Sequence, residues 1–227
     1  MLMTEIINQI ADSLKQFDST KPVHKKFKPG IGPFGEPQLV RHIIEDMNKN
    51  GIKAISKKTP DLQILNEWGL EIKIARPFVD NGVEAEDWSV NLLHPYPGHY
   101  SLMGDGLKLQ KLTDVGHKGL VVIGFEHNPA KISLNPLFDA FELVARGVMK
   151  FTLSKRVEEL RSNLVHPVHQ VLRVIGWELS ERYPSHDGTN QGNEGSRPQG
   201  QQDLAQALLK SGLPLEWEIN QIPRNRP

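Results

Sequence analysis

The stretch Pro60-Asp-Leu-Gln-Ile-Leu-Asn-Glu-Trp-Gly-Leu-Glu-Ile-Lys-Ile74 holds the pattern from which the fold is predicted. Its last five residues alternate between apolar and charged, which is typical of a β-strand with one apolar and one polar face. A second extended segment is expected over Asp61–Leu65, and a chain reversal at Asn66–Gly69 would join the two segments as a hairpin. Such a hairpin brings Asp61 close to Glu71.

The segments around this hairpin predict a mixed α/β domain with a central sheet. The continuous apolar run Lys118–Phe125 is typical of a buried central strand. The pattern of Val168–Leu179 is ambiguous, and we favour a strand. Further extended segments are expected at Lys53–Ser56 and Trp88–Leu93. Helices are expected where apolar residues recur at helical spacing: from a Thr4 cap to Phe17, from Glu36 to the Asn50-Gly51 turn, and over Leu102–Thr113, Pro136–Met149 and Ser154–Leu164.

The chain of 227 residues has room for one sizeable core, which we expect within residues 1–183. From 184 to 203 there is no aliphatic or aromatic side chain. Such a segment cannot offset its ordering entropy by burial, so it predicts a disordered linker. Residues 204–227 are expected to form a tail with a short helix at Leu204–Leu209.

Composition excludes several classes of protein. There is no cysteine, which rules out disulfide scaffolds, thiolate zinc sites and cysteine nucleophiles, and fits a reducing cytoplasm. The 27 basic and 27 acidic residues balance, so any contact with nucleic acid must depend on a local patch. No stretch is long and apolar enough to cross a bilayer, and the N-terminal residues lack the basic region of a signal peptide. We therefore expect a cytoplasmic protein without a membrane partner.

Three acids and one lysine form the candidate catalytic site: Glu36, Asp61, Glu71 and Lys73. Two carboxylates that face each other across a hairpin repel, so they usually need a cation. Hard oxygen ligands with room for water suit Mg²⁺. Lys73 shares the polar face of its strand with Glu71, where its charge can stabilise a developing anion or orient a water molecule. Glu36, at the start of the preceding helix, could supply a third carboxylate.

In their order along the chain, these residues resemble the PD-(D/E)xK nuclease superfamily. The likeness is to restriction endonucleases and Holliday-junction-resolvase-like nucleases, and it covers residues 30 to 127. The stretches that carry it are Glu36-Pro-Gln-Leu-Val-Arg-His-Ile43, Asn50-Gly51-Ile52, Pro60-Asp61 and Leu70-Glu71-Ile72-Lys73. The motifs are short and degenerate, so the order of elements carries more weight than the letters.

The resemblance implies a restriction-endonuclease-like fold, in which helices flank a central mixed sheet, here with added helices. It implies that Asp61 and Glu71 bind Mg²⁺, or Mn²⁺ in its place, with the Ile72 carbonyl as a further ligand. Glu36 would reach the ion directly or through water, and Lys73 would position the attacking water. The reaction would be metal-assisted hydrolysis of DNA by a restriction or defence endonuclease. A homodimer would suit the cleavage of two strands.

Basic residues near the candidate site are expected to contact DNA. The loop 19–35 holds Lys25, Lys26 and Lys28 without an acidic residue, and it is either a solvated loop or a contact to the DNA backbone. The resemblance also points to the region of Lys108, Gln110 and Lys111, from which the family often contributes a polar side chain. We expect Lys108 and Lys111 to contact DNA and Gln110 to be an accessory residue.

Other interpretations stay open. Asp61, Glu71 and Lys73 could be a turn aspartate and an exposed ion pair on an edge strand, and Glu36 could be an acid of the helix N-cap region that the macrodipole stabilises. The protein could also be a non-catalytic DNA-binding or assembly protein that keeps this fold, or a cytosolic interaction protein whose motif is accidental. Residues Gly30–Gly35 match G-x-G-x-x-G but do not follow an apolar strand, so a dinucleotide site is disfavoured. The pairs His94/His99 and His166/His169 could bind zinc, but Pro167 disfavours a helix, and we expect loop or surface histidines.

Overall fold

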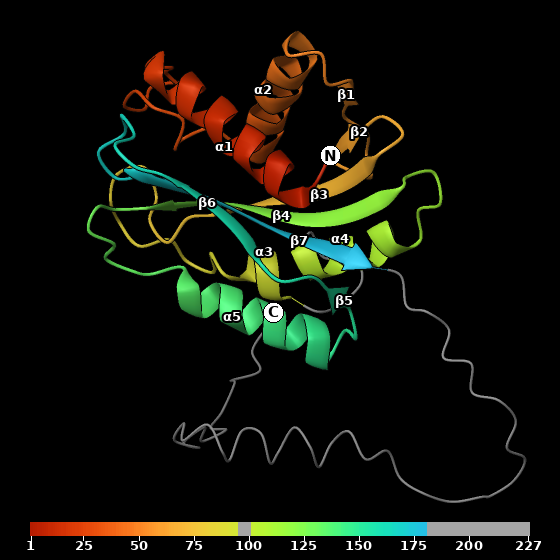
Figure 1. The fold of residues 1–227 in the computed structure, drawn as a ribbon. Helices are drawn as coiled ribbons and strands as arrows, with labels where there is room; N and C mark the ends of the chain where they lie inside the picture. Colours follow the sequence, from red (N-terminus) through yellow and green to blue (C-terminus); the bar gives the residue numbers. More distant parts are fainter. Residues whose placement is uncertain (95–100, 181–227) are drawn as a thin grey trace, which may run out of the picture. The chain divides into compact units, whose positions relative to one another are not determined.

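A computed structural model describes residues 1–94 and 101–180 (Figure 1). The expected linker, the expected tail helix and His99 lie outside the described residues.

The centre of the structure is a seven-stranded mixed sheet. Its strands are β1 (Ala54–Ile55), β2 (Leu62–Ile64), β3 (Trp68–Ala75), β4 (His117–Glu126), β5 (Thr152–Leu153), β6 (Val157–Arg161) and β7 (Val171–Ser180). Their order is β1-β2-β3-β4-β7-β5, and β6 also pairs with β7. Strands β3 and β4 run parallel, whereas the other pairs are antiparallel.

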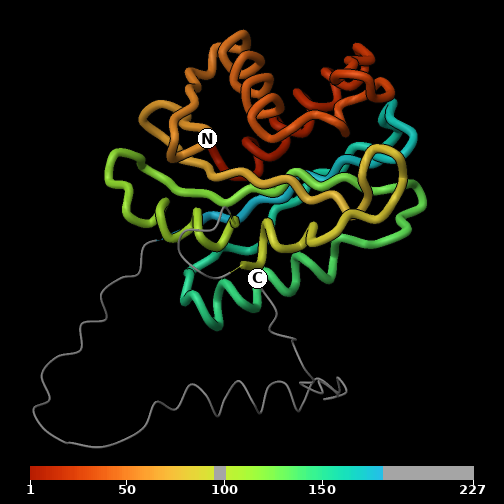
Figure 2. Tube along the Cα trace, turned by 180° about the vertical axis from the view of Figure 1, so that it is seen from behind, coloured from red at the N-terminus to blue at the C-terminus, as the bar shows by residue number. Residues whose placement is uncertain are grey.

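Helices cover both faces of the sheet, as Figures 1 and 2 show from opposite sides. One face carries α1 (Met3–Ser19) and α2 (Glu36–Lys49), and the other carries α3 (Val90–Leu93), α4 (Leu102–Gln110) and α5 (Asn135–Gly147). Strand β4 shows why two layers form. Val121 and Ile123 belong to the core under α1 and α2, whereas Leu120 and Val122 belong to the core under α4 and α5. The predicted mixed α/β domain with a buried central strand is confirmed.

The hairpin that positions the candidate site is confirmed as well. Leu62 of β2 lies opposite Leu70 of β3 in an antiparallel register. Asp61 immediately precedes β2, so the register brings it to Glu71. Strand β3 has β2 on one side and β4 on the other. It is therefore not an edge strand, and its polar face is covered.

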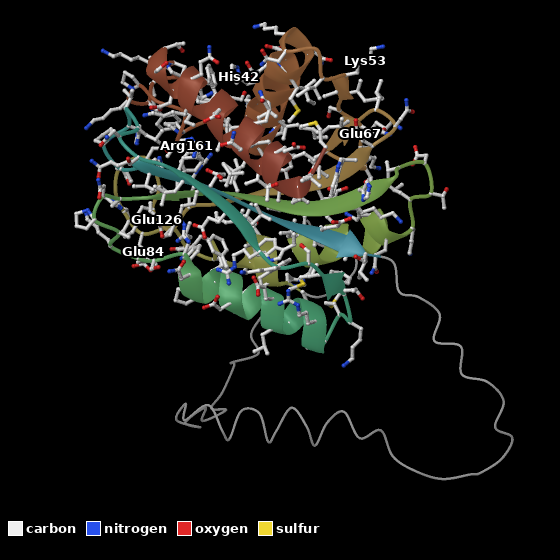
Figure 3. All side chains as sticks on the ribbon, in the orientation of Figure 1. His42, Lys53, Glu67, Glu84, Glu126 and Arg161 are labelled. Atoms are coloured by element: carbon white, nitrogen blue, oxygen red, sulfur yellow. The ribbon has the colours of Figure 1, made fainter. Side chains whose placement is uncertain are left out.

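Two expected elements are wrong. The segment Ser154–Leu164 is not a helix, because β6 pairs antiparallel with β7 over Val157–Arg161 and alternates half-buried with exposed residues. Its charged side chains made it look helical, but they form ion pairs between elements. Arg161, for example, binds Asp12 of α1 at 2.8 Å (Figure 3).

The second error concerns Trp88–Leu93, which was expected to be extended and forms the short helix α3 instead. The segment cannot pair with β3, because β2 and β4 already pair with its two edges. As a helix, the segment buries Leu92 in the core under the sheet. Smaller differences concern helix ends. Leu2, not Thr4, caps α1, and its amide donates to the Glu5 carboxylate at 2.6 Å. Helix α4 ends at Gln110 instead of Thr113.

Among the described residues, no helix is long and apolar enough to pass through a membrane.

Candidate active site

Three elements bring the expected catalytic residues to one place. Glu36 is the first residue of α2 and is followed by Pro37, whose missing amide hydrogen costs nothing at a helix start. Asp61 precedes β2, and Glu71 and Lys73 lie two residues apart on β3. The charged side chains of β3 are buried, with exposed fractions of 2% for Glu71 and 8% for Lys73. The interpretation of these residues as an exposed ion pair on an edge strand is therefore wrong.

Asp61 and Glu71 form a tightly coupled pair of carboxyl groups. The Ile72 amide donates to Asp61 Oδ2 at 2.9 Å, which fixes the aspartate against β3. Burial, and after it the charge and hydrogen bond of Asp61, raises the pKa of Glu71 from 4.5 to about 9. Glu71 Oε1 is buried and has no hydrogen-bond partner. At neutral pH Glu71 thus holds a proton, and its Oε1 has no hydrogen-bond partner.

Lys73 is held by three oxygen atoms. Its Nζ lies 2.9 Å from Asp105 Oδ2 and 3.4 Å from Glu36 Oε1, and it donates to the Ile72 carbonyl at 3.1 Å. Burial alone lowers the pKa of Lys73, but Glu36 and Asp105 outweigh burial and raise the pKa above its ordinary value of 10.5. The amine therefore stays charged at physiological pH. It can stabilise an anion but cannot act as a base.

Asp105 is a member of the site that the sequence analysis missed. It lies on α4, is only 5% exposed, and binds Lys108 Nζ at 2.6 Å through its second oxygen. A signal was available, because Asp105 falls three residues after Leu102 and four before Leu109 on the apolar face of a helix. A buried acid at such a position needs a cationic partner. Lys73 is that partner.

The three acids could provide oxygen ligands for a cation, but their oxygens do not converge on one point. Within residues 1–94 and 101–180, the oxygens of Glu36, Asp61 and Glu71 do not all come within 4.8 Å of one another. The Lys73 ammonium already binds two of the expected metal ligands, Glu36 and the Ile72 carbonyl. The donor set nevertheless fits Mg²⁺, because Glu71 Oε1 is an unpartnered buried oxygen beside a second carboxyl group.

Two grooves meet at Glu36. One, of about 720 Å³, is lined by Glu36, Lys73, Arg76, Asp80 and Trp88 among others. The other, of about 510 Å³, is lined by Glu36 and Asp61 together with three basic residues, Arg41, Lys57 and Lys58. These three cations were not among the expected DNA contacts. They come together because the segment after β1 lies beside the first turns of α2, and no motif marks them.

The expected DNA contacts do not line these two grooves. Lys25, Lys26 and Lys28 are exposed in the loop before α2, and Lys111 is exposed after α4. Lys108 binds Asp105. Gln110 is half-buried, and its backbone carbonyl accepts a hydrogen bond from Lys118 Nζ at 3.1 Å. The structure thus brings the four catalytic candidates together, and of the six residues expected to contact DNA or assist it brings Lys108 to the site, through Asp105.

Comparison of the chain with protein-family models, with curated proteins and with solved structures finds no match.

Proposed function

We propose that this chain is a Mg²⁺-dependent endonuclease that hydrolyses phosphodiester bonds of DNA, with a restriction-endonuclease-like fold of the PD-(D/E)xK superfamily. The observation that carries the proposal is the buried Glu71 carboxyl group, which lies against Asp61 and leaves Oε1 without a partner. A buried carboxyl pair that cannot hold both negative charges without a cation is expected where a cation binds.

The residues have distinct roles in this proposal. Asp61, Glu71, Glu36 and the Ile72 carbonyl would hold the ion. When bound, Mg²⁺ supplies a Lewis acid that stabilises charge on the phosphodiester. Glu71 gives up its proton as its carboxylate becomes a ligand. Lys73 keeps its positive charge, because Glu36 and Asp105 surround it, and it balances the charge on the scissile phosphate. Asp105 positions Lys73 and does not touch the substrate.

The groove next to Asp61 supports a polyanionic substrate on one side of the site. Arg41, Lys57 and Lys58 line the groove next to Asp61, and contacts to phosphate by such residues provide affinity without sequence selection. A cytoplasmic homodimer that cleaves both strands, in a restriction or defence role, is the assembly that we propose.

The test is plasmid nicking in Mg²⁺ or Mn²⁺, together with calorimetric titration of Mg²⁺. Lys73→Ala should abolish nicking and leave DNA binding unchanged, whereas Lys49→Ala, at the exposed far end of α2, should cut normally. Asp61→Asn should lose Mg²⁺ binding, and Asp114→Asn, an exposed aspartate, should keep it. Absence of Mg²⁺ binding in the unmodified protein would overturn the proposal.

A non-catalytic DNA-binding or assembly protein that keeps this fold is the second candidate. The observation that favours it is that the Lys73 ammonium binds two of the expected metal ligands, Glu36 and the Ile72 carbonyl. Steeply salt-dependent DNA binding without Mg²⁺ binding or cleavage would identify this second function.

A further inference from the structure

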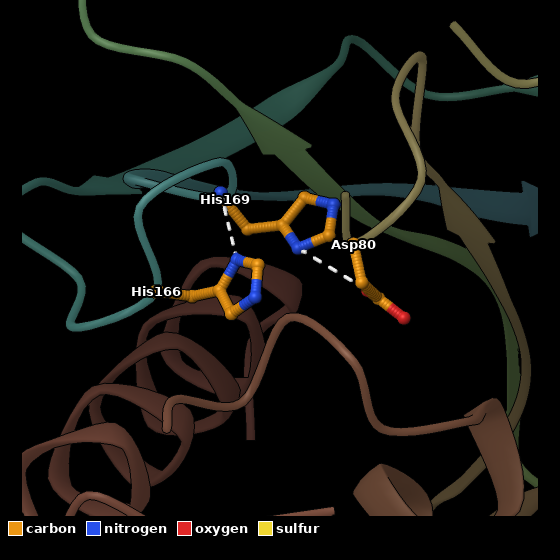
Figure 4. A group of neighbouring side chains, drawn as sticks. All are labelled: Asp80, His166 and His169. Atoms are coloured by element: carbon orange, nitrogen blue, oxygen red, sulfur yellow. Dashed lines mark hydrogen bonds and ion pairs between the residues drawn. The ribbon is translucent and has the colours of Figure 1, made fainter. Parts of the chain in front are cut away.

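A second cluster of ligand groups lies apart from the carboxyl pair. Asp80, in the loop after β3, and His166 and His169, in the loop between β6 and β7, each place a ligand atom within 4.8 Å of the others (Figure 4). In the part of the chain that the structure describes, this is the only group of three acid or histidine side chains that meets this spacing. The loop position of the two histidines is as expected. Their burial is not, since they are 0% and 1% exposed.

His169 is oriented as a metal ligand. Its Nε2 lies 3.0 Å from the Phe78 carbonyl, so this nitrogen carries the hydrogen and donates it. The other nitrogen, Nδ1, then has a free lone pair, which is buried without a hydrogen-bond partner and lies 3.8 Å from Asp80 Oδ1. A histidine that donates one N–H to a carbonyl and turns its other nitrogen to an ion is the usual arrangement at metal sites.

His166 supplies the second ring. Its Nε2 is buried and unpartnered, and its ring stacks on His169 with a centroid distance of 4.9 Å. Its Nδ1 accepts amide hydrogens from Val168 and His169 only at the long distances of 3.3 and 3.4 Å. Binding of an ion to Nε2 requires the ring hydrogen to move to Nδ1, which can then no longer accept these two amide hydrogens, so we expect the loop around Pro167 to shift when an ion binds.

Glycines keep the space around the two rings open. A Cβ atom on Gly32 would lie 2.2 Å from His169 Nδ1, and one on Gly30 would lie 2.8 Å from the His166 Cβ. Any other residue at position 32 would therefore fill the space beside the free nitrogen. The glycines of the loop before α2 are thus explained by their packing against the two histidines, without a dinucleotide-binding site.

From these observations we propose that Asp80, His166 and His169 form a binding site for a divalent transition-metal ion, of which Zn²⁺ is the first candidate. Two imidazole nitrogens and one carboxylate suit Zn²⁺ and its neighbours and do not suit Mg²⁺, which prefers oxygen ligands. Asp80 also lines the groove that runs to Glu36 and Lys73, so the proposed metal site borders that groove. The site would be separate from the carboxyl pair and does not depend on the proposed nuclease function.

The charges around the cluster set the expected affinity. Asp80 is the one anionic ligand of the three, and the buried Arg76 guanidinium lies close enough to lower the pKa of both histidines, after the larger effect of burial. Both rings are thus neutral and available at pH 7. The charge of Arg76 opposes a dication, so binding should be weaker than at a site with two carboxylates.

The ion would join two segments that lie far apart in the sequence, the loop after β3 and the loop between β6 and β7. Asp18 already links the second of these loops to the loop before α2, since its Oδ1 accepts from the Ile31 amide at 3.0 Å and its Oδ2 from the Val165 amide at 2.8 Å. Asp80 would add the loop after β3. Because the ion binds only the folded arrangement of these loops, metal binding should raise the thermal stability of the chain.

The test is titration of the full chain with Co²⁺, followed by its visible absorption bands, and displacement by Zn²⁺. We expect one Co²⁺ per chain. Asp80→Ala, at a partly exposed position, and His169→Ala should each weaken binding more than about tenfold, because loss of even an outer-shell partner has effects of that size. His117→Ala, at an exposed histidine, and Asp61→Asn should bind as the unmodified protein does.

Circular dichroism should show that the variants are folded, and Asp80→Ala keeps the test meaningful if His169→Ala does not fold. Absence of saturable Co²⁺ or Zn²⁺ binding would overturn the proposal, as would equal binding by Asp80→Ala. Loss of Co²⁺ binding in Asp61→Asn would also overturn it, because the ion would then lie at the carboxyl pair.

Discussion

Replacement of Glu71 by glutamine should make the protein more stable at neutral pH, although it removes a side chain of the proposed active site. Burial and Asp61 raise the pKa of Glu71 from 4.5 to about 9. Between these two values the folded protein holds a proton that the unfolded chain has released, so the free energy of unfolding falls as pH rises. At about 1.4 kcal/mol per pH unit, the loss between pH 4.5 and pH 7 is about 3 kcal/mol.

Glutamine has the shape of the protonated acid, can donate to Asp61, and does not ionise. We therefore expect Glu71→Gln to match the unmodified protein near pH 4 and to exceed its unfolding free energy by about 3 kcal/mol at pH 7. Urea unfolding from pH 4 to pH 9 in the presence of EDTA, followed by the fluorescence of the buried Trp68 and Trp177, measures this difference. Glu84→Gln, at an exposed glutamate, is the matched control.

Parallel pH profiles for Glu71→Gln and the unmodified protein would refute the reasoning. So would a glutamine variant that is less stable at pH 7. If the proposed function holds as well, Mg²⁺ should raise the stability of the unmodified protein near pH 8 and should have little effect on Glu71→Gln, because the amide is a poorer ligand than the carboxylate.

Three further substitutions test other parts of the structure. Asp105→Asn should lower the pKa of Lys73 and destabilise the fold by about 1–3 kcal/mol, because it leaves Lys73 with one acid fewer. It should also reduce any Mg²⁺-dependent nicking. Urea unfolding measures the loss of stability and the nicking assay the loss of activity, with Asp114→Asn as the control. Arg173→Met should lower the free energy of unfolding by about 3–5 kcal/mol, because it removes the partner of Glu126, which is 7% exposed. A change below 1 kcal/mol in urea unfolding would contradict the assignment of this pair as a buried ion pair. Gly32→Ala should cost about 1–3 kcal/mol in thermal unfolding, since its Cβ would meet the His169 ring, whereas Gly147→Ala, with nothing within 4 Å of the new atom, should be neutral or stabilising.

Local patterns were enough to predict most of the sheet. The apolar run of β4 and the alternation in β3 are short-range signals that survive in the structure, and the turn before Trp68 set the register of the hairpin. The element β6 could not be predicted in this way. Its sequence has charged residues on both sides, and what makes it a strand is the free edge of β7, which is supplied by residues that follow it.

The site was predictable to the extent that its residues lie in one hairpin. Asp61 and Glu71 are joined by a tight turn, so their proximity followed from the sequence. Asp105 reaches Lys73 only because α4 packs under β3, and the pair Asp80 and His169 depends on two loops separated by nearly ninety residues. Contacts of this kind are set by tertiary packing, so the spacing of residues along the sequence does not predict them.

The parallel pairing of β3 and β4 also bears on how far this protein can vary in length. Parallel neighbours cannot be joined by a tight turn, so the chain between Ala75 and His117 must cross one face of the sheet before it returns. That crossover carries Asp105 to Lys73 and Asp80 to the two histidines. Insertions at the turn near Gly82, between the bridged residues Phe78 and Glu84, would lengthen the crossover without moving α4. Deletions close to Asp105 would draw the acid away from its lysine. The connection between β3 and β4 should therefore tolerate changes of length at its beginning and not around α4, both in evolution and in protein engineering.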